Sequence, residues 1–337
     1  MIDSINYIIR DIEWVNFEYL LKQGIIPKEF KNINKNNGFT NICYSFNYKG
    51  VEFKYNKSYK IITILTNAHK ILNKRDVTLN DLEEYKSKLQ DILSIVFNNS
   101  DVKLELNRID YCVDIPLSEE DIHLYHSLLY FNKRSYKYMK QERLYLSSTY
   151  LKNKNGKTNI NFYHRYSKTQ NEDDKGILRL ELQCKKKLIK SEYYNYGIPR
   201  ELDYYWSKES MEEYYFNYLR NYLYEGDYYT INKAKEIIDN SETLKFDMKR
   251  KLKKFIRRIG RLQLSNLMDP EFCRVKRLDY NVGKINYYIE KLNSIGVNPI
   301  PIQNLQGLHT DKECLPSLYN LARQVAEDKY FNENSDI

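Results

Sequence analysis

The stretch "LNRIDYCVDI", residues 106–115, decides the fold, because its alternation is typical of a strand with two different faces. Residues two apart on a strand share a face, so Arg108, Asp110 and Asp114 point one way. The opposite face carries Ile109, Tyr111, Val113 and Ile115. Charged side chains are costly to bury unless they are paired or bind a metal ion. The polar face therefore predicts an ion-pair network or a metal site.

A second stretch, "ILRLELQCK" at residues 177–185, alternates in the same way and places Arg179, Glu181 and Gln183 on one face. If the two strands lie close together in a sheet, their carboxylates form a cluster of hard oxygen ligands suited to Mg²⁺ or Mn²⁺. The alternative is a ladder of arginine–carboxylate pairs across the strands without a metal. The pattern alone leaves both interpretations open.

A third stretch, "NINFYHRYSK" at residues 159–168, places Tyr163 and Arg165 on one face and His164 and Tyr166 on the other. Only one of these pairs can face the carboxylates unless a bulge intervenes. His164 could supply a nitrogen ligand or act as a base.

The first 205 residues mix strands with helices and contain tight hairpins, which predicts an α+β domain built on an antiparallel sheet flanked by helices. Further strands are expected at residues 2–10, 40–67 (two or three strands), 142–150 and 158–166. Helices are expected at residues 14–24, 78–99 and 118–131. We place one domain at residues 1–205 and a helical C-terminal domain at 206–337.

The second predicted domain contains a strongly basic helix, "DMKRKLKKFIRRIGRL", residues 247–262. Its apolar residues recur at helical spacing and leave the other face to cations. The candidate DNA-binding residues on that face are Lys253, Lys254, Arg257, Arg258 and Arg261. Such a face contacts phosphates, although an ordinary solvated helix face is the alternative.

The composition suits a nucleic-acid partner. The 337-residue chain has a formal net charge of +9 and 33 tyrosines. Lysine and arginine neutralise phosphates while aromatic rings stack on bases. An AT-rich genome would also enrich a chain in Tyr, Asn, Lys and Ile, so composition alone does not decide the matter.

Other classes of protein lack their sequence signals here. No apolar run approaches the roughly 18 residues of a membrane span, and the first residues lack the pattern of a signal peptide, so we expect a cytoplasmic protein without a membrane partner. The five cysteines form no CxxC pair, so neither a disulfide framework nor a structural zinc site is expected. No GxxxxGK[ST] loop is present, so no P-loop nucleotide site is expected.

Three blocks in one order, "NRIDYCVDI", "INFYHRYSK" and "GILRLELQCKKKLI", resemble the signature of rolling-circle replication initiators. The similar group is the phage and plasmid replication proteins that include the filamentous-phage nicking-closing protein and its Gram-positive relatives. The segments "MIDSINY" and "GKINYYIEKLNSIGVNP" resemble that family too. The resemblance implies a nickase-like core and a metal-dependent, strand-specific DNA endonuclease and ligase. In that reaction a tyrosine attacks a phosphodiester, keeps the 5′ phosphate as an ester and frees a 3′-OH, and a second transfer reseals the DNA.

The resemblance also implies roles for individual residues. Asp110 and Glu181 match the acidic residues of the family's "RID" and "RFE" motifs and become the leading ligands for Mg²⁺ or Mn²⁺. The remaining expected ligands are Asp114 and His164. Arg108 and Arg179 match the motif arginines and would pair with a carboxylate or hold a phosphate.

The middle block departs from the family, because His164 and Arg165 stand where relatives often have Asp and Lys. The nucleophile stays open for the same reason. Tyr166 is the first choice, Tyr163 the second and the tyrosines at 193–196 the third.

The partners that the resemblance implies are origin DNA, single-stranded or hairpin at the nick and duplex at the recognition site, together with a host helicase and polymerase. A homodimer is a further option. Two other functions stay open: a replication or regulatory protein of the same lineage that binds the origin without cutting, and an RNA-binding or RNA-processing α+β protein.

Overall fold

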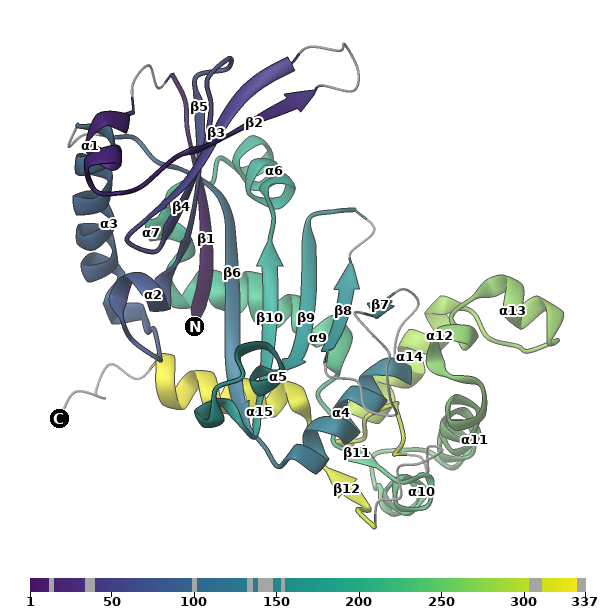
Figure 1. Ribbon diagram of the computed structural model, residues 1–337. Helices are drawn as coiled ribbons and strands as arrows, with labels where there is room; N and C mark the ends of the chain where they lie inside the picture. The colour runs from purple at the N-terminus through teal and green to yellow at the C-terminus, as the bar shows by residue number, and fades with distance from the viewer. Residues whose placement is uncertain are drawn as a thin grey trace.

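A ten-stranded antiparallel sheet runs through the described part of the computed structural model (Figure 1). The structure describes residues 1–11, 15–33, 40–98, 102–131, 136–138, 148–152, 155–302 and 311–331. The strand order is β2-β3-β4-β5-β1-β6-β10-β9-β8-β7. The strands are β1 (Ile2–Ile9), β2 (Lys28–Ile33), β3 (Thr40–Tyr48), β4 (Val51–Asn56), β5 (Ile61–Asn67), β6 (Glu105–Pro116), β7 (Tyr136–Tyr138), β8 (Ser148–Lys152), β9 (Thr158–His164) and β10 (Ile177–Cys184).

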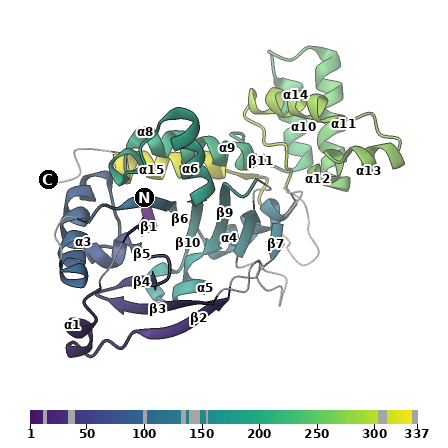
Figure 2. The same cartoon turned by 90° about the horizontal axis from the view of Figure 1, so that it is seen from above.

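Helices cover the two sides of the sheet unequally. Figure 2 shows α6, α8, α9 and α15 along one side, while α5 lies on the other side with β2 and β3. The helices of the sheet region are α1 (Phe17–Lys22), α2 (Ala68–Leu72), α3 (Leu82–Phe97), α4 (Glu119–Phe131), α5 (Arg165–Thr169), α6 (Lys186–Tyr196), α7 (Leu202–Tyr205), α8 (Lys208–Ser210), the π-helical η3 (Met211–Phe216), α9 (Asn217–Leu223), α15 (Leu318–Ala326) and the π-helical η4 (Glu327–Phe331).

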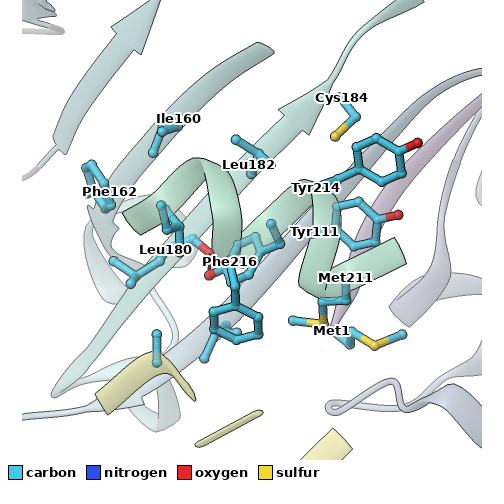
Figure 3. Packing of buried hydrophobic residues seen from close by; sticks show 14 of the residues in the cluster. Met1, Tyr111, Ile160, Phe162, Leu180, Leu182, Cys184, Met211, Tyr214 and Phe216 are labelled. Carbon is cyan, nitrogen blue, oxygen red and sulfur yellow. Dashed lines mark hydrogen bonds between the residues drawn. The ribbon is translucent and has the colours of Figure 1, made fainter. Parts of the chain in front are cut away.

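The opening stretch of the sequence forms β6, which lies in the middle of the sheet between β1 and β10. Its apolar face belongs to the core: Tyr111, Leu180 and Phe162, from three neighbouring strands, are completely buried. Figure 3 shows these side chains in one cluster with Met211, Tyr214 and Phe216. The core therefore sits between the apolar side of the sheet and the helices that cover it.

Two hydrogen bonds join those covering segments to the sheet. The hydroxyl of Tyr215 in η3 donates to the carbonyl of Leu180, 3.0 Å away, and the hydroxyl of Tyr111 donates to the carbonyl of Tyr205 at 2.7 Å. Buried tyrosine hydroxyls need such partners, since an unpaired polar group in a core costs free energy. The covering helices are therefore joined to the sheet by polar as well as apolar contacts.

Beyond Leu223 the chain forms a separate helical lobe, visible at the right of Figure 1. The lobe contains α10 (Ile231–Asn240), α11 (Phe246–Leu262), α12 (Leu264–Leu267), α13 (Pro270–Val275) and α14 (Val282–Asn293). A short pair, β11 (Tyr228–Tyr229) and β12 (Cys314–Leu315), lies where the chain enters and leaves it.

These elements confirm the predicted fold class, an antiparallel sheet flanked by helices and followed by a helical C-terminal region. The predicted boundary between residues 205 and 206 falls just before η3 and α9, which complete the core of the sheet. Helix α15 packs on β6 as well. The segment predicted as a separate helical domain therefore supplies both the lobe and part of the sheet's cover. Most of the strand predicted at 142–150 lies outside the described residues.

All five cysteines are free thiols. Cys43, Cys112, Cys184 and Cys273 are buried, whereas Cys314 in β12 is exposed. Among the helices in the described ranges, none combines the length and apolar character needed to cross a bilayer.

Candidate active site

Three adjacent strands, β6, β10 and β9, bring the predicted site residues onto the polar face of the sheet. Arg179 on β10 pairs with Asp114 on one side and Tyr163 on the other. Asp110 and Glu181 lie further along the same face and are only 1% and 3% exposed. The alternation of residues along each strand explains why polar side chains gather opposite an apolar core. The sheet thus assembles a buried polar cluster from segments far apart in the sequence.

One end of this cluster is an ion-pair network around Asp114. Arg179 donates two hydrogen bonds to its carboxylate, from Nε at 2.6 Å and from Nη2 at 2.7 Å. Arg165 contacts the same carboxylate from the first turn of α5, and Arg179 Nη1 also lies 3.1 Å from Asp3 Oδ1 on β1. Burial would raise the pKa of Asp114, but the hydrogen bonds and charge of Arg179, with the charge of Arg165, lower it to about 2. Asp114 is therefore an ionised partner of arginine, which fits the ladder interpretation at this end.

The other end of the cluster holds the carboxylates of Asp110 and Glu181, which have fewer arginines to balance their charge. Arg108 Nε donates to Asp110 Oδ1 at 2.7 Å, and a second guanidinium nitrogen contacts the other oxygen. Even so, burial raises the pKa of Asp110 to about 7; Arg108 acts to lower it, and the nearby charge of Glu181 raises it further. A buried carboxylate whose charge is disfavoured by burial and by a second carboxylate is a typical setting for a bound cation.

The oxygen atoms around Asp110 and Glu181 fit a hard divalent ion with few protein ligands. Asn159 Oδ1 is buried without a hydrogen-bond partner, while its amide nitrogen donates to Gln183 Oε1 at 3.1 Å. Within the described ranges, no group of three or more His, Cys, Asp or Glu side chains is arranged to hold a metal ion. Mg²⁺ commonly takes only one or two carboxylates and keeps several waters. The two buried carboxylates, Asp110 and Glu181, are enough for that coordination.

The hydroxyl of Tyr163 faces the carboxylate of Glu181. The hydroxyl donates to Glu181 Oε2 at 3.3 Å and accepts from Lys168 Nζ at 3.1 Å. The Lys168 ammonium also lies 4.4 Å from the centre of the ring, because α5 turns back immediately after β9 ends. Burial raises the pKa of the phenol well above its usual value of 10; the charge of Arg179 acts to lower it and that of Glu181 raises it. The hydroxyl is thus a weak acid held between a carboxylate and a cation.

The structure corrects the placement of His164 among the metal ligands. His164 pairs with Leu178 and belongs to the opposite face of the sheet from Tyr163. There it neighbours His123 and His126 on α4, and burial together with its proximity lowers the pKa of both. Burial lowers the pKa of His164, so its imidazole is neutral at pH 7. One step along a strand reverses the face, and this places the ring on the far side of the sheet from Asp110 and Glu181.

Tyr166, the first choice for the nucleophile, also lies away from the carboxylates. Its ring centre is 6.0 Å from that of His164, and the ammonium of Lys175 lies 5.2 Å from its centre. The third choice, the tyrosines at 193–196, belongs to α6 on the other side of the sheet. Of the three choices made from the sequence, Tyr163 is the one beside Glu181.

Several residues of the site were missed. Lys168 and Asn159 stand inside the third quoted stretch, and counting along its strand would have placed Asn159 on the face of Tyr163. Tyr150 on β8 contacts Asn159, and its pKa is raised by burial, lowered by Arg108 and raised by the two carboxylates. The loop between residues 150 and 158 predicts a hairpin, and β8 does pair with β9, but the sequence does not fix the register that brings Tyr150 to Asn159.

The predicted DNA-binding residues lie on α11, and the structure divides them into two groups. Lys253 Nζ is paired with Asp239 Oδ1 at 2.5 Å, and the Arg258 guanidinium lies 5.2 Å from the centre of the Tyr280 ring. Lys254, Arg257 and Arg261 are exposed. Arg257 and Arg261 line a cavity of about 640 Å³ beside α10. The exposed group is available to contact phosphates.

Comparisons with known proteins find a distant structural similarity. No protein-family model matches the chain, and no curated protein matches it. One similar solved structure is a rolling circle replication initiator protein from Geobacillus stearothermophilus, with 13% identity, a TM-score of 0.33, and coverage of 55% of this chain and 73% of that one. At so low a TM-score, neither the fold nor the activity of this protein is inferred from the match.

Proposed function

We propose that the protein nicks and rejoins one strand of DNA at a replication origin, as initiators of rolling-circle replication do. The position of Tyr163 carries the proposal: its hydroxyl lies between the carboxylate of Glu181 and the ammonium of Lys168. A hydroxyl nucleophile needs a neighbouring base and a positive charge to react at neutral pH. The resemblance of the three strand motifs to that family points to the same reaction.

In this mechanism Glu181 takes the proton of the Tyr163 hydroxyl as its oxygen attacks the phosphorus atom. The new bond joins Tyr163 Oη to phosphorus, the bond from phosphorus to the 3′ oxygen breaks, and a proton returns to the departing 3′-OH. Lys168 neutralises charge at the phenol oxygen, and Arg108, whose side chain is 34% exposed, holds a phosphate oxygen. The reverse transfer reseals the strand.

A divalent ion would be held by Asp110, Glu181 and the free amide oxygen of Asn159. When bound, Mg²⁺ or Mn²⁺ polarises the scissile phosphate and stabilises its developing charge. Tyr163 is 4% exposed and Lys168 lies over its ring, so access for a phosphodiester requires α5 to move away from the ring. A host helicase and polymerase would then act from the freed 3′-OH.

The test is a nicking assay on a supercoiled plasmid that carries the coding segment of the protein and its flanks, with Mn²⁺ present. We expect open circles whose 5′ end is covalently linked to protein. Tyr163→Phe should abolish the adduct, because it removes only the attacking oxygen, whereas Tyr166→Phe serves as the matched control and should retain it. Sequencing the DNA-linked peptide identifies the tyrosine directly. A linked peptide that contains Tyr150 or Tyr166 would reject the assignment of Tyr163.

A second candidate function is origin binding without cleavage. It is favoured by the arginines that already neutralise carboxylates, Arg108 on Asp110 and Arg179 on Asp114. In that case no adduct forms. Asp110→Asn and Glu181→Gln would then bind origin DNA like the unmodified protein, and no plasmid would be relaxed at any concentration of Mn²⁺.

A further inference from the structure

A cleft of about 430 Å³ lies at the rim formed by the ends of the central strands, where β1 ends and β6 begins, beside α6. We call it the edge cleft. Figure 1 shows these three elements together at the end of the sheet opposite α5. Its walls include Arg10, Lys103, Lys190 and Arg200, with Tyr193 and Tyr194 from α6. None of these residues takes part in the reaction proposed above.

The lining of the edge cleft holds more cations than carboxylates: Arg10, Lys103, Lys190 and Arg200 against Glu105 and Glu201. Glu105 is occupied by two arginines, with Arg200 Nη1 at 2.7 Å and Arg10 Nε at 3.5 Å from its carboxylate. Lys103 and Lys190 have no carboxylate within ion-pair distance in the described part of the chain. Lys186, one turn before Lys190, has its pKa lowered by burial and then by the charges of Lys190 and the two arginines. Uncompensated cations of this kind attract a polyanion.

Aromatic rings stand beside these cations. Tyr193 is 48% exposed and Tyr194 is 74% exposed, and their ring centres lie 5.3 Å apart. Helix α6 buries Leu188 and Ile189 instead and turns its tyrosines to solvent. Exposed rings next to cations are the combination that binds single strands, because bases stack on the rings while lysines neutralise phosphates.

We propose that the edge cleft binds single-stranded DNA, with bases on Tyr193 and Tyr194 and phosphates on Lys103 and Lys190. A duplex would offer phosphates to the lysines but would keep its bases stacked within the helix, away from the tyrosines. Glu105 at the cleft and Asp110 at the candidate site are five residues apart on β6, about 16 Å along a strand. The choice of DNA rather than RNA rests on the proposed function.

The experiment measures binding of a fluorescein-labelled oligo(dT) by fluorescence anisotropy in EDTA, at several salt concentrations. The double variant Tyr193→Ala/Tyr194→Ala should weaken binding by about 5-fold to 150-fold for each base that loses its stacking partner. Tyr193→Phe/Tyr194→Phe keeps the rings and should bind within about twofold of the unmodified protein. Tyr59→Ala removes a similarly exposed ring from the β4–β5 turn and should have no effect. Lys103→Ala and Lys190→Ala should each reduce the salt dependence by about 0.7 in log–log slope.

Three results would overturn the proposal: the double alanine variant binds oligo(dT) normally, it loses duplex binding to the same degree, or the unmodified protein prefers an oligo(U) of equal length. Because EDTA removes divalent ions, an inactive nickase would still bind in this assay. Failure here leaves the Tyr163 adduct untouched, and loss of the adduct leaves binding at the edge cleft untouched, so the two proposals fail separately.

Discussion

The two ends of the polar face differ in how their carboxylates are paired, and Arg179 marks the end where they are fully paired. It holds Asp114 with two hydrogen bonds and reaches Asp3 on a third strand, so this end is a closed ion-pair network. At the other end Asp110 shares its surroundings with Glu181, and its pKa is raised to about 7. The closed end joins β1, β6 and β10 through ion pairs, while the open end keeps carboxylates that a cation or a substrate can use.

Removal of Asp114 should therefore affect stability. Asp114→Ala leaves Arg179 buried without its main partner and should lower the free energy of unfolding by about 3–5 kcal/mol, measured by urea denaturation. Replacing both residues, Asp114→Leu with Arg179→Met, should recover part of that loss, because the buried charge of Arg179 is removed together with that of Asp114 while Arg165 keeps its second partner, Asp174. Equal losses in the single and double variants would contradict this account.

The ion pair between Arg179 and Asp114 should also make the free energy of unfolding depend on pH. The pKa of Asp114 is lowered to about 2 in the folded protein, below the usual 3.8 of an unfolded chain. The folded state thus binds fewer protons than the unfolded state between these values, and the ion pair stabilises fully above pH 4 and progressively less as the pH falls toward 2. The Asp114→Asn variant should not show this loss of stability between pH 4 and pH 2 when urea denaturation is measured over the same pH range.

At the level of single residues, alternation in the sequence was enough to place Arg108, Asp110 and Asp114 on one face. It could not reveal that Arg179 pairs with Asp114, because the register between strands so far apart in the sequence depends on the whole sheet. The error with His164 has a similar origin: it is the last strand residue before α5, and its face was left undecided between two alternatives. His164 lies outside the site because of the face on which its strand position places it, and not because of its residue type.

Some cations of helix α11 are paired with other residues of the lobe, and others are exposed to solvent. Only the exposed cations are available to bind DNA. Lys253 is held by Asp239 on α10, so it contributes to packing within the lobe. Lys254, Arg257 and Arg261 are exposed, and two of them line the cavity beside α10. The helix was predicted within one residue of its observed bounds, Phe246–Leu262, because its apolar residues recur at helical spacing. Partners such as Asp239 and Tyr280 come from other helices and could not be predicted.

Charge reversal on this helix should weaken duplex DNA binding. The triple variant Lys254→Glu/Arg257→Glu/Arg261→Glu should reduce the log–log salt slope of duplex affinity by about 0.9 for each phosphate that the helix no longer neutralises. The matched control reverses Arg274, Lys276 and Arg277, which are exposed at the end of α13 and change the net charge equally. If both triple variants weaken binding alike, overall charge and not the surface of α11 is responsible.

For the molecule as a whole, the sheet and its cover come from both halves of the sequence. Strands β1, β6 and β10 were predicted, and so was the antiparallel sheet, because hairpins and alternation are local signals. The contribution of η3, α9 and α15 to the sheet's core was not predicted, since an amphipathic helix does not specify which apolar surface it will cover. The boundary between residues 205 and 206 was placed where a mixture of predicted strands and helices gives way to helices alone.

A fragment of residues 1–205 should consequently fail to fold cooperatively. It would lose η3, α9 and α15 and would expose the apolar side of β6 and β10, including Leu180 and Phe162. We expect poor solubility and no sharp thermal transition in circular dichroism. A chain in which only the lobe, residues 231–293, is replaced by a short linker keeps that cover and should melt cooperatively. A sharp transition for 1–205 would show that the cover is dispensable.

The exposed thiol of Cys314 offers one site at which the unmodified protein can be labelled with a fluorescent dye. The other four cysteines are buried, so a maleimide dye would react at this single place without any mutation. Burial raises the pKa of the Cys314 thiol, and a mildly alkaline buffer would therefore speed the attachment. Its neighbour Glu313 lines the cavity that Arg257 and Arg261 share. A fluorophore at Cys314 would report, in real time, when DNA arrives at the basic helix and when it leaves.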